Sequence, residues 1–192
     1  MRKYFETIRF VVILGLFTST VLLGMEYITN KRIEAVIEAR FKQSVLDAHS
    51  LSYTDSNFED IYSDEITELN LEANTFYVSN TTGNVTFEFS GGGVWGPISG
   101  VITLDSNFLL IVNIIVLVQE ETPGLGGIVA EDQYLETFVG KSMLPSIDIV
   151  KDALTLENNQ VDSITGATKT SDAFEIILNT TYSELKTIWD NQ

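Results

Sequence analysis

The chain has 192 residues, a formal net charge of −16, a single histidine and no cysteine. This composition excludes disulfides, cysteine-ligated iron–sulfur clusters and zinc sites built from histidine and cysteine, and we expect no metal site. The negative charge argues against nucleic-acid binding, which requires a basic face. Any redox function would therefore depend on an organic cofactor.

Basic residues are confined to the two ends of the chain, because residues 43–140 contain fifteen Asp and Glu but no Lys or Arg. Residues 43–140 can therefore supply no Lys or Arg to a bound phosphate. The phosphate would be held by backbone N–H groups, hydroxyls or a covalent bond, with Lys169 as the one cation close in sequence to the Asp162–Ser171 segment described below. The same acidity is also typical of a soluble surface. We interpret the lone histidine, His49, as structural or solvated.

The first hydrophobic segment is an uncharged run from Phe10 to Met25 that follows the basic residues Arg2, Lys3 and Arg9. A spanning helix needs about 20 residues, and the neighbouring side chains extend this run toward that length. A signal peptide is the alternative, but no A-x-A-like cleavage site follows. We predict an uncleaved single-pass anchor over residues 1–28, with the remainder of the chain outside the cytoplasm.

Apolar residues at helical spacing continue beyond the anchor and predict a helical stalk over residues 29–46. Residues 47–192 are predicted to form one small α+β domain, an antiparallel-rich sheet with flanking helices. Its first part, residues 47–70, is polar and acidic, and we expect only loops and short elements there.

Four segments of the domain have the alternation or the β-branched composition of strands, and the first two form a predicted hairpin. They are residues 75–78, 85–89, 98–104 and 108–118. A loop containing proline and glycine follows, and then a short helix, a strand and a polar turn. These later segments are residues 120–127, 131–139, 147–150 and 157–160.

The last helix follows a segment of small and hydroxyl residues, Asp162 to Ser171. Apolar residues at helical spacing predict that this helix begins after Thr170, with Asp172 and Glu175 placed for a capping box. Free N–H groups and the dipole at the start of a helix favour an anion. A Ser/Thr-rich turn that only caps the helix is the alternative.

The run from Asp162 to Thr168 resembles the flavinylation motif of the FMN-binding family that includes the NqrC component of the Na+-translocating NADH:quinone reductase (Nqr) and the RnfG component of the Rnf complex. Three further patterns occur upstream in the order found in that family. They are Gly-x-Trp-Gly-Pro-Ile at 93–98, Glu-Thr-Pro-Gly-Leu-Gly-Gly at 121–127 and Phe-x-Gly-Lys at 138–141. Together they extend the resemblance over residues 87–178.

The resemblance implies a covalent FMN cofactor, joined through its phosphate to Thr168 by a separate flavin transferase. The other motif residues expected at the cofactor are Asp162, Thr165, Gly166, Ala167, Lys169 and Thr170. A second loop would lie beside the isoalloxazine ring, and it comprises Glu121, Thr122, Pro123, Gly124, Leu125 and Gly126. Trp95 would lie either near the flavin or in the core.

The function implied by the resemblance is that of an electron-transfer subunit in a membrane-bound, ion-translocating oxidoreductase complex of the Rnf or Nqr type. Its partners would be the other membrane subunits, and it would perform no substrate chemistry of its own. Two alternatives remain open. One is a free-standing, membrane-anchored flavoprotein of an extracellular electron-transfer chain, and the other is a small-molecule-binding module without redox chemistry.

Overall fold

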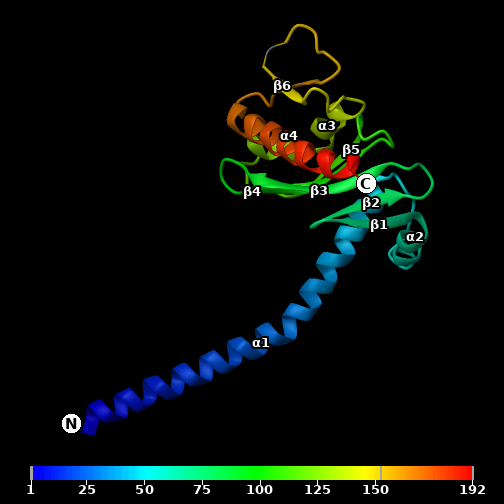
Figure 1. The fold of residues 1–192 in the computed structure, drawn as a ribbon. Helices are drawn as coiled ribbons and strands as arrows, with labels where there is room; N and C mark the ends of the chain where they lie inside the picture. The colour runs from blue at the N-terminus through cyan, green and yellow to red at the C-terminus, as the bar shows by residue number, and fades with distance from the viewer. Residues whose placement is uncertain (1, 152, 192) are drawn as a thin grey trace. The chain divides into compact units, whose positions relative to one another are not determined.

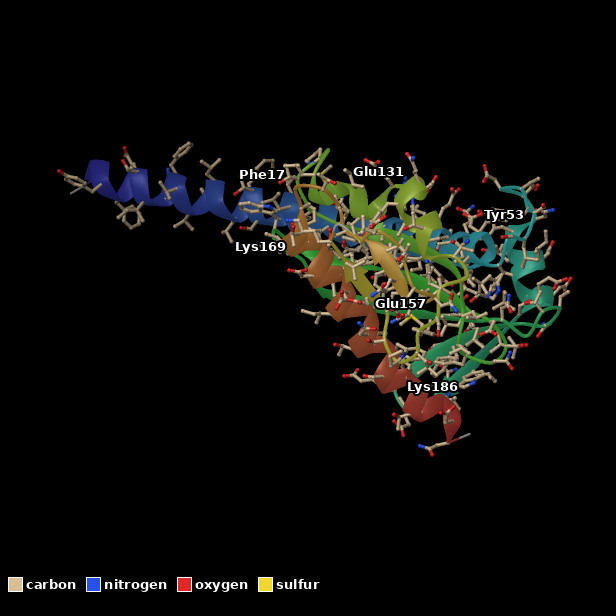
Figure 2. All side chains as sticks on the ribbon, turned by 90° about the horizontal axis from the view of Figure 1, so that it is seen from above. Phe17, Tyr53, Glu131, Glu157, Lys169 and Lys186 are labelled. Carbon is tan, nitrogen blue, oxygen red and sulfur yellow. The ribbon has the colours of Figure 1, made fainter. Side chains whose placement is uncertain are left out.

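The computed structural model describes residues 2–151 and 153–191. The chain divides into two compact units, Met1–Phe41 and Lys42–Gln192. The N-terminal helix α1 (Arg2–Ala48) is continuous, so the predicted anchor and stalk belong to one helix. Its apolar part is long enough to cross a membrane, and its side chains are exposed, as Phe17 is at 67% (Figure 2). Such exposure of an apolar helix suits a lipid environment.

The second unit contains a five-stranded antiparallel sheet in which each strand pairs with the next along the chain (Figure 1). The strands are β1 (Ile66–Leu71), β2 (Asn74–Ser79), β3 (Val85–Gly92), β4 (Pro97–Leu104) and β5 (Ile111–Val118). This arrangement confirms the predicted α+β class and its antiparallel sheet. The short elements expected in residues 47–70 are helix α2 (Phe58–Glu65) and the edge strand β1.

Strand β5 begins three residues later than predicted because the chain makes a turn first. Phe108 has a positive φ of 57°, and the Asp105 carboxylate accepts the N–H groups of Leu109 and Leu110, each at 2.8 Å. The turn directs the Phe108 ring into the core, where it stacks on Phe87 with ring centroids 5.3 Å apart. A long apolar run thus contributes both a turn and a strand.

The segment after β5 is folded into short helices. The loop predicted at 120–127 leads into the 3-10 helix η1 (Gly126–Ala130). The predicted helix at 131–139 is shorter in the structure, and it comprises α3 (Asp132–Leu135) and the 3-10 helix η2 (Glu136–Phe138).

A second, parallel strand pair lies outside the main sheet, formed by β6 (Asp148–Val150) and β7 (Gln160–Asp162). The prediction of a polar turn at 157–160 overlooked β7, whose three residues give no recognisable alternation. The register places Val150 opposite Asp162, and the Ser163 N–H donates to the Val150 carbonyl at 2.8 Å. This pairing joins the start of the 151–159 connection to the Asp162–Ser171 segment.

Helix α4 (Thr168–Asp190) lies across the sheet over β3 and β4 (Figure 1). Its buried face includes Phe174 and Ile177, as the helical spacing predicted. A Cβ at Gly91 of β3 would lie 2.5 Å from Cγ1 of Ile177, so the glycine permits the close approach of α4 to the strand.

The predicted start of α4 and its capping box are wrong. The helix begins at Thr168, and its N-cap residue, Ala167, has no side chain that could cap it. The Glu175 carboxylate instead accepts the Ile149 N–H at 2.6 Å, so it ties α4 to β6. The N–H groups of Ala167 and Thr170 donate to the carbonyls of Ile164 and Ala167, each at 3.0 Å, so the N–H groups of Thr168 and Lys169 are the ones that this helix start offers to a ligand.

His49 follows α1 and has a structural role. Its Nε2 lies 2.9 Å from the Thr86 hydroxyl, which is 2.6 Å from the buried Thr103 hydroxyl. Burial lowers the pKa of His49, and a backbone hydrogen bond with Tyr77 opposes the shift only in part. The histidine is therefore held in its neutral form within the domain.

Candidate functional site

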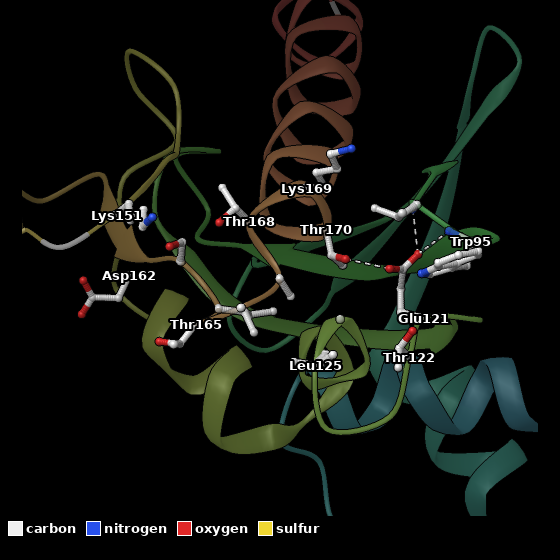
Figure 3. A pocket seen from close by; sticks show the side chains of 16 residues that line it. Trp95, Glu121, Thr122, Leu125, Lys151, Asp162, Thr165, Thr168, Lys169 and Thr170 are labelled. Atoms are coloured by element: carbon white, nitrogen blue, oxygen red, sulfur yellow. Dashed lines mark hydrogen bonds between the residues drawn. The ribbon is translucent and has the colours of Figure 1, made fainter.

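A pocket of about 700 Å3 opens where three segments of the domain meet, and Lys151, from a fourth segment after β6, completes its lining (Figure 3). The segments are the loop after β3, the loop before η1 and the Asp162–Thr170 segment leading into α4. The volume is in the range that holds a cofactor-sized ligand.

The start of α4 is shaped by a tight turn over Ile164–Ala167. The Ala167 N–H donates to the Ile164 carbonyl at 3.0 Å, and Gly166 has the positive φ, +80°, that a type II turn requires at its third residue. The buried Ser171 hydroxyl then accepts the Ile164 N–H at 3.0 Å. The turn thus delivers Thr168 to the first position of the helix, beside the pocket.

The three threonines of the motif have different environments. Thr165 and Thr168 are exposed and line the pocket, whereas Thr170 is only 4% exposed. The Thr170 hydroxyl donates to Oε2 of Glu121 at 2.7 Å. Thr170 is therefore unavailable to an incoming group, and Thr168 presents its hydroxyl at the helix start.

Glu121 lines the pocket and is 4% exposed. Its Oε1 accepts the backbone N–H groups of Val94 and Trp95, at 2.7 and 3.0 Å. Burial alone would raise the pKa of Glu121, but the hydrogen bonds from Thr170 and from the backbone of Trp95 and Val94 outweigh it and lower the pKa. Glu121 is thus an ionised carboxylate with three donors.

Two glycines make room for this carboxylate. A Cβ at Gly93 would lie 2.6 Å from Oε1 of Glu121, and a Cβ at Gly126 would lie 2.7 Å from Oε2. The Gly126 Cβ would also lie 2.6 Å from the Thr170 hydroxyl. The Gly93–Gly96 segment is therefore an ordered part of the site, because its backbone N–H groups bind the buried Glu121 carboxylate and Gly93 leaves space for it.

The end of the pocket formed by Trp95, away from Thr168, is apolar and exposed. Trp95 is 73% exposed, so the alternative that it packs in the core is wrong. Val94, the neighbour of Trp95 in the chain, is 42% exposed, whereas Leu125, 45% exposed, lies against the motif turn, because a Cβ at Gly166 would be 3.3 Å from its Cδ2. Figure 3 shows Trp95 and Thr168 at opposite ends, with the Glu121 carboxylate between Trp95 and Thr170.

Most of the residues expected at the cofactor line this one pocket. They are Trp95, Glu121, Thr122, Leu125, Gly126, Asp162, Thr165, Gly166, Ala167, Thr168, Lys169 and Thr170. Pro123 and Gly124 are not among its lining residues. The Leu125 N–H donates to the Thr122 carbonyl at 3.1 Å, which leaves Pro123 and Gly124 at the exposed tip of a turn.

Sequence reasoning missed four lining residues, Val94, Lys151, Ser163 and Ile164. Lys151 matters most because it adds a second cation near Thr168 (Figure 3). It follows Val150, and only the parallel register of β6 and β7 brings it to the motif. The strand-like residues before Lys151 correctly indicate a strand there, but the sequence gives no sign of its partner strand β7, so the position of Lys151 beside the motif could not be predicted.

The lining residues fit a ligand that has a phosphate at one end and a flat ring at the other. At the Thr168 end are hydroxyls, first-turn N–H groups and the cations Lys151 and Lys169, which together suit a phosphate. At the Trp95 end the apolar side chains suit an aromatic ring. FMN combines these two features.

Comparison with known proteins agrees with this chemistry. Residues 93–183 match the FMN-binding domain family. NqrC, a component of the Na(+)-translocating NADH-quinone reductase, is 36% identical in Chlamydia caviae over 59 residues, 31% of this chain and 18% of that protein. NqrC of Vibrio vulnificus (strain YJ016) is 31% identical over 91 residues, 44% of this chain and 36% of that protein. The chain thus spans well under two thirds of these relatives.

A longer alignment joins the chain to NqrC of Pseudomonas aeruginosa, 24% identical over 191 residues, 82% of this chain and 72% of that protein. Two solved structures share the fold. NqrC from Parabacteroides distasonis has a TM-score of 0.66 at 24% identity and covers 76% of this chain and 88% of its own. NqrC from Shewanella oneidensis has a TM-score of 0.67 at 18% identity, covering 77% and 97%.

Proposed function

Because residues 93–183 match the FMN-binding domain family, we propose that this protein is a membrane-anchored electron-transfer flavoprotein with FMN bound covalently to Thr168. It acts within a membrane oxidoreductase complex of the Nqr or Rnf type. The protein positions the cofactor and tunes its surroundings, while bound FMN supplies the redox chemistry.

The observation that carries this proposal is the exposed Thr168 hydroxyl at the first residue of α4, within a pocket where the Thr170 hydroxyl is already engaged. A phosphate on Thr168 meets the N–H groups and the positive dipole end of the helix. The nearby lysines Lys151 and Lys169 offset its charge.

Attachment requires a flavin transferase that uses FAD and magnesium. In this reaction the Thr168 oxygen forms a bond to the riboflavin-side phosphorus of FAD, and the bond from that phosphorus to AMP breaks. The Thr168 hydroxyl loses its proton, and AMP leaves with the electron pair. No oxidant or reductant is consumed, so the attached FMN keeps the redox state that it had in FAD.

The proposed location is the outer side of a membrane. Helix α1 supports an anchor by its length and apolar composition, and the basic residues that precede its apolar run favour a cytoplasmic N-terminus. A covalent bond would keep the flavin from being lost by diffusion outside the cytoplasm. Protease treatment of intact cells tests this orientation, since only an outward-facing domain would be digested.

In-gel fluorescence tests the covalent bond directly. The full chain is coexpressed with a flavin transferase, denatured, separated by electrophoresis and viewed under ultraviolet light. Wild type and Thr168→Ser should fluoresce, whereas Thr168→Ala should be dark. A dark wild-type band would refute covalent attachment, and a fluorescent Thr168→Ala band would refute the assignment to Thr168.

Purification from membranes tests the proposed partners. A component of an Nqr- or Rnf-type complex should co-purify with other membrane subunits after mild detergent extraction. Recovery of the flavinylated chain alone, still able to accept electrons, would instead identify a free-standing carrier of an extracellular electron-transfer chain.

A further inference from the structure

We infer that Glu121 is the positioning residue of the Thr168 site, because its buried carboxylate joins the backbone of Val94 and Trp95 to the first turn of α4. The inference rests on the proposed function, since it assigns Glu121 the task of presenting Thr168 for flavin attachment. Glu121 itself need not touch the flavin.

The carboxylate connects segments that are far apart in the chain. Its donors Val94, Trp95 and Thr170 lie 27, 26 and 49 residues away from it. They belong to the loop after β3 and to α4. One side chain therefore fixes the relative position of the two ends of the pocket, the Trp95 end and the Thr168 end (Figure 3).

The chemistry of these three contacts selects a carboxylate. All three partners donate hydrogen bonds, and both oxygens of an ionised Glu accept. A Gln of the same shape keeps the two backbone donors on its carbonyl oxygen, but its NH2 group then faces the Thr170 hydroxyl, which must accept instead of donate, and the charge that strengthens all three bonds is lost. Charge-assisted bonds of this kind are also stronger than bonds between neutral groups.

The contact with α4 explains how Glu121 acts on Thr168. Thr170 lies in the first helical turn, two residues after Thr168, and its side chain is buried against Glu121. Holding Thr170 fixes the rotation of that turn, and with it the direction in which the Thr168 hydroxyl points. Gly93 and Gly126 keep the space that this arrangement needs.

The test compares Glu121→Gln with the exposed neighbour Glu120→Gln in the full chain, purified in detergent. Flavin attachment is followed by in-gel fluorescence with purified transferase, FAD and magnesium, well below the melting temperature of every variant. We expect a rate about tenfold lower for Glu121→Gln and less than about twofold lower for Glu120→Gln, the scale of one lost charge-assisted hydrogen bond. Equal rates for the two variants would overturn the inference.

Amide hydrogen exchange on the flavin-free protein gives a second readout that needs no flavin chemistry. Glu121→Gln should speed exchange at Val94, Trp95 and the first turn of α4, while strands β1 and β2 keep their wild-type protection. Unchanged exchange at these sites would overturn the inference. If the wild type takes up no flavin but Glu121→Gln still speeds exchange at these sites, the proposed function is refuted and the positioning contact remains supported.

Thr170 variants provide the test if Glu121→Gln does not fold. Thr170→Val removes one of the three donors at constant shape and should slow attachment several-fold. Thr170→Ser keeps the hydroxyl and should restore a rate close to that of wild type. A slow Thr170→Ser, equal to Thr170→Val, would show that packing and not the hydrogen bond matters, and would overturn the inference.

Discussion

The hydroxyl of Thr170 donates a 2.7 Å hydrogen bond to the buried carboxylate of Glu121, a residue 49 positions earlier in the chain. This bond divides the threonines of the Asp162–Ser171 segment into one that supports the fold and others that face the pocket. It also ties the stability of the domain to the protonation of a single carboxyl group.

Thr170→Val should lower the free energy of unfolding by about 1–3 kcal/mol, because Glu121 loses a donor while it stays buried. The pKa of Glu121 lies below its ordinary value of 4.5, so its stabilising contribution is present above pH 4.5 and is lost as the pH falls through the folded-state pKa. In Thr170→Val this pKa rises toward 4.5, so the variant should lose less stability than wild type as the pH falls below 4.5. Thermal melting between pH 3 and pH 7 measures both effects, and coincident curves would contradict them.

Gly93→Ala and Gly92→Ala form a matched pair of neighbouring substitutions. The new Cβ at 93 would lie 2.6 Å from Oε1 of Glu121, whereas nothing lies within 4 Å of a Cβ at 92. We expect Gly93→Ala to cost about 1–3 kcal/mol, the range for overpacking, and Gly92→Ala to be nearly neutral. Urea unfolding measures the difference, and equal costs for the two variants would disprove the crowding around Glu121.

His49 should make the domain acid-sensitive near neutral pH. Its folded-state pKa is lower than the unfolded value of 6.5, so stability is complete above that pH and falls as the pH drops from 6.5 to the lowered pKa. Each unit of pKa difference corresponds to about 1.4 kcal/mol. Melting temperatures at pH 7.5 and pH 5.5 should differ more for wild type than for His49→Gln, and an equal difference would exclude His49 as the cause.

Lys151 should contribute to FMN binding through charge. In a Thr168→Ala background, where binding is non-covalent, Lys151→Gln should weaken FMN affinity by about two- to fivefold, as expected for an exposed cation. The effect should shrink at high salt. Quenching of flavin fluorescence measures it, with Lys141→Gln as the control because Lys141 does not line the pocket. An equal loss of FMN affinity in both variants would show that the net charge of the protein, and not the position of Lys151, causes the effect.

The main sheet could be predicted because its signals are local. The segments that became β2, β3 and β4 alternate or carry β-branched residues, and each pairs with a neighbour close in sequence. Strand β7 has three residues and pairs with β6 across a connection outside the main sheet, so no local pattern identifies it. The proximity of Lys151 to Thr168 follows from that pairing and was overlooked with it.

The candidate site could be located from its motifs, but its internal arrangement could not. Nothing in the composition of residues 121–127 indicates that the Glu121 carboxylate turns inward, because its donors come from distant segments. The same holds for Trp95, whose backbone N–H donates to Glu121 while its side chain is exposed.

The order of strands in the sheet has a consequence for the timing of cofactor attachment. Sequential antiparallel hairpins have low contact order and need only short loop closures, so β1 to β5 should form early in folding. The Glu121–Thr170 bond joins residues 49 positions apart and should form late. Until then the hydroxyls of Thr168 and Thr170 are equally accessible. A transferase that requires the ordered first turn of α4 would therefore attach flavin only to chains whose fold is complete, and pulse-labelled hydrogen exchange during refolding would reveal the order of these folding steps.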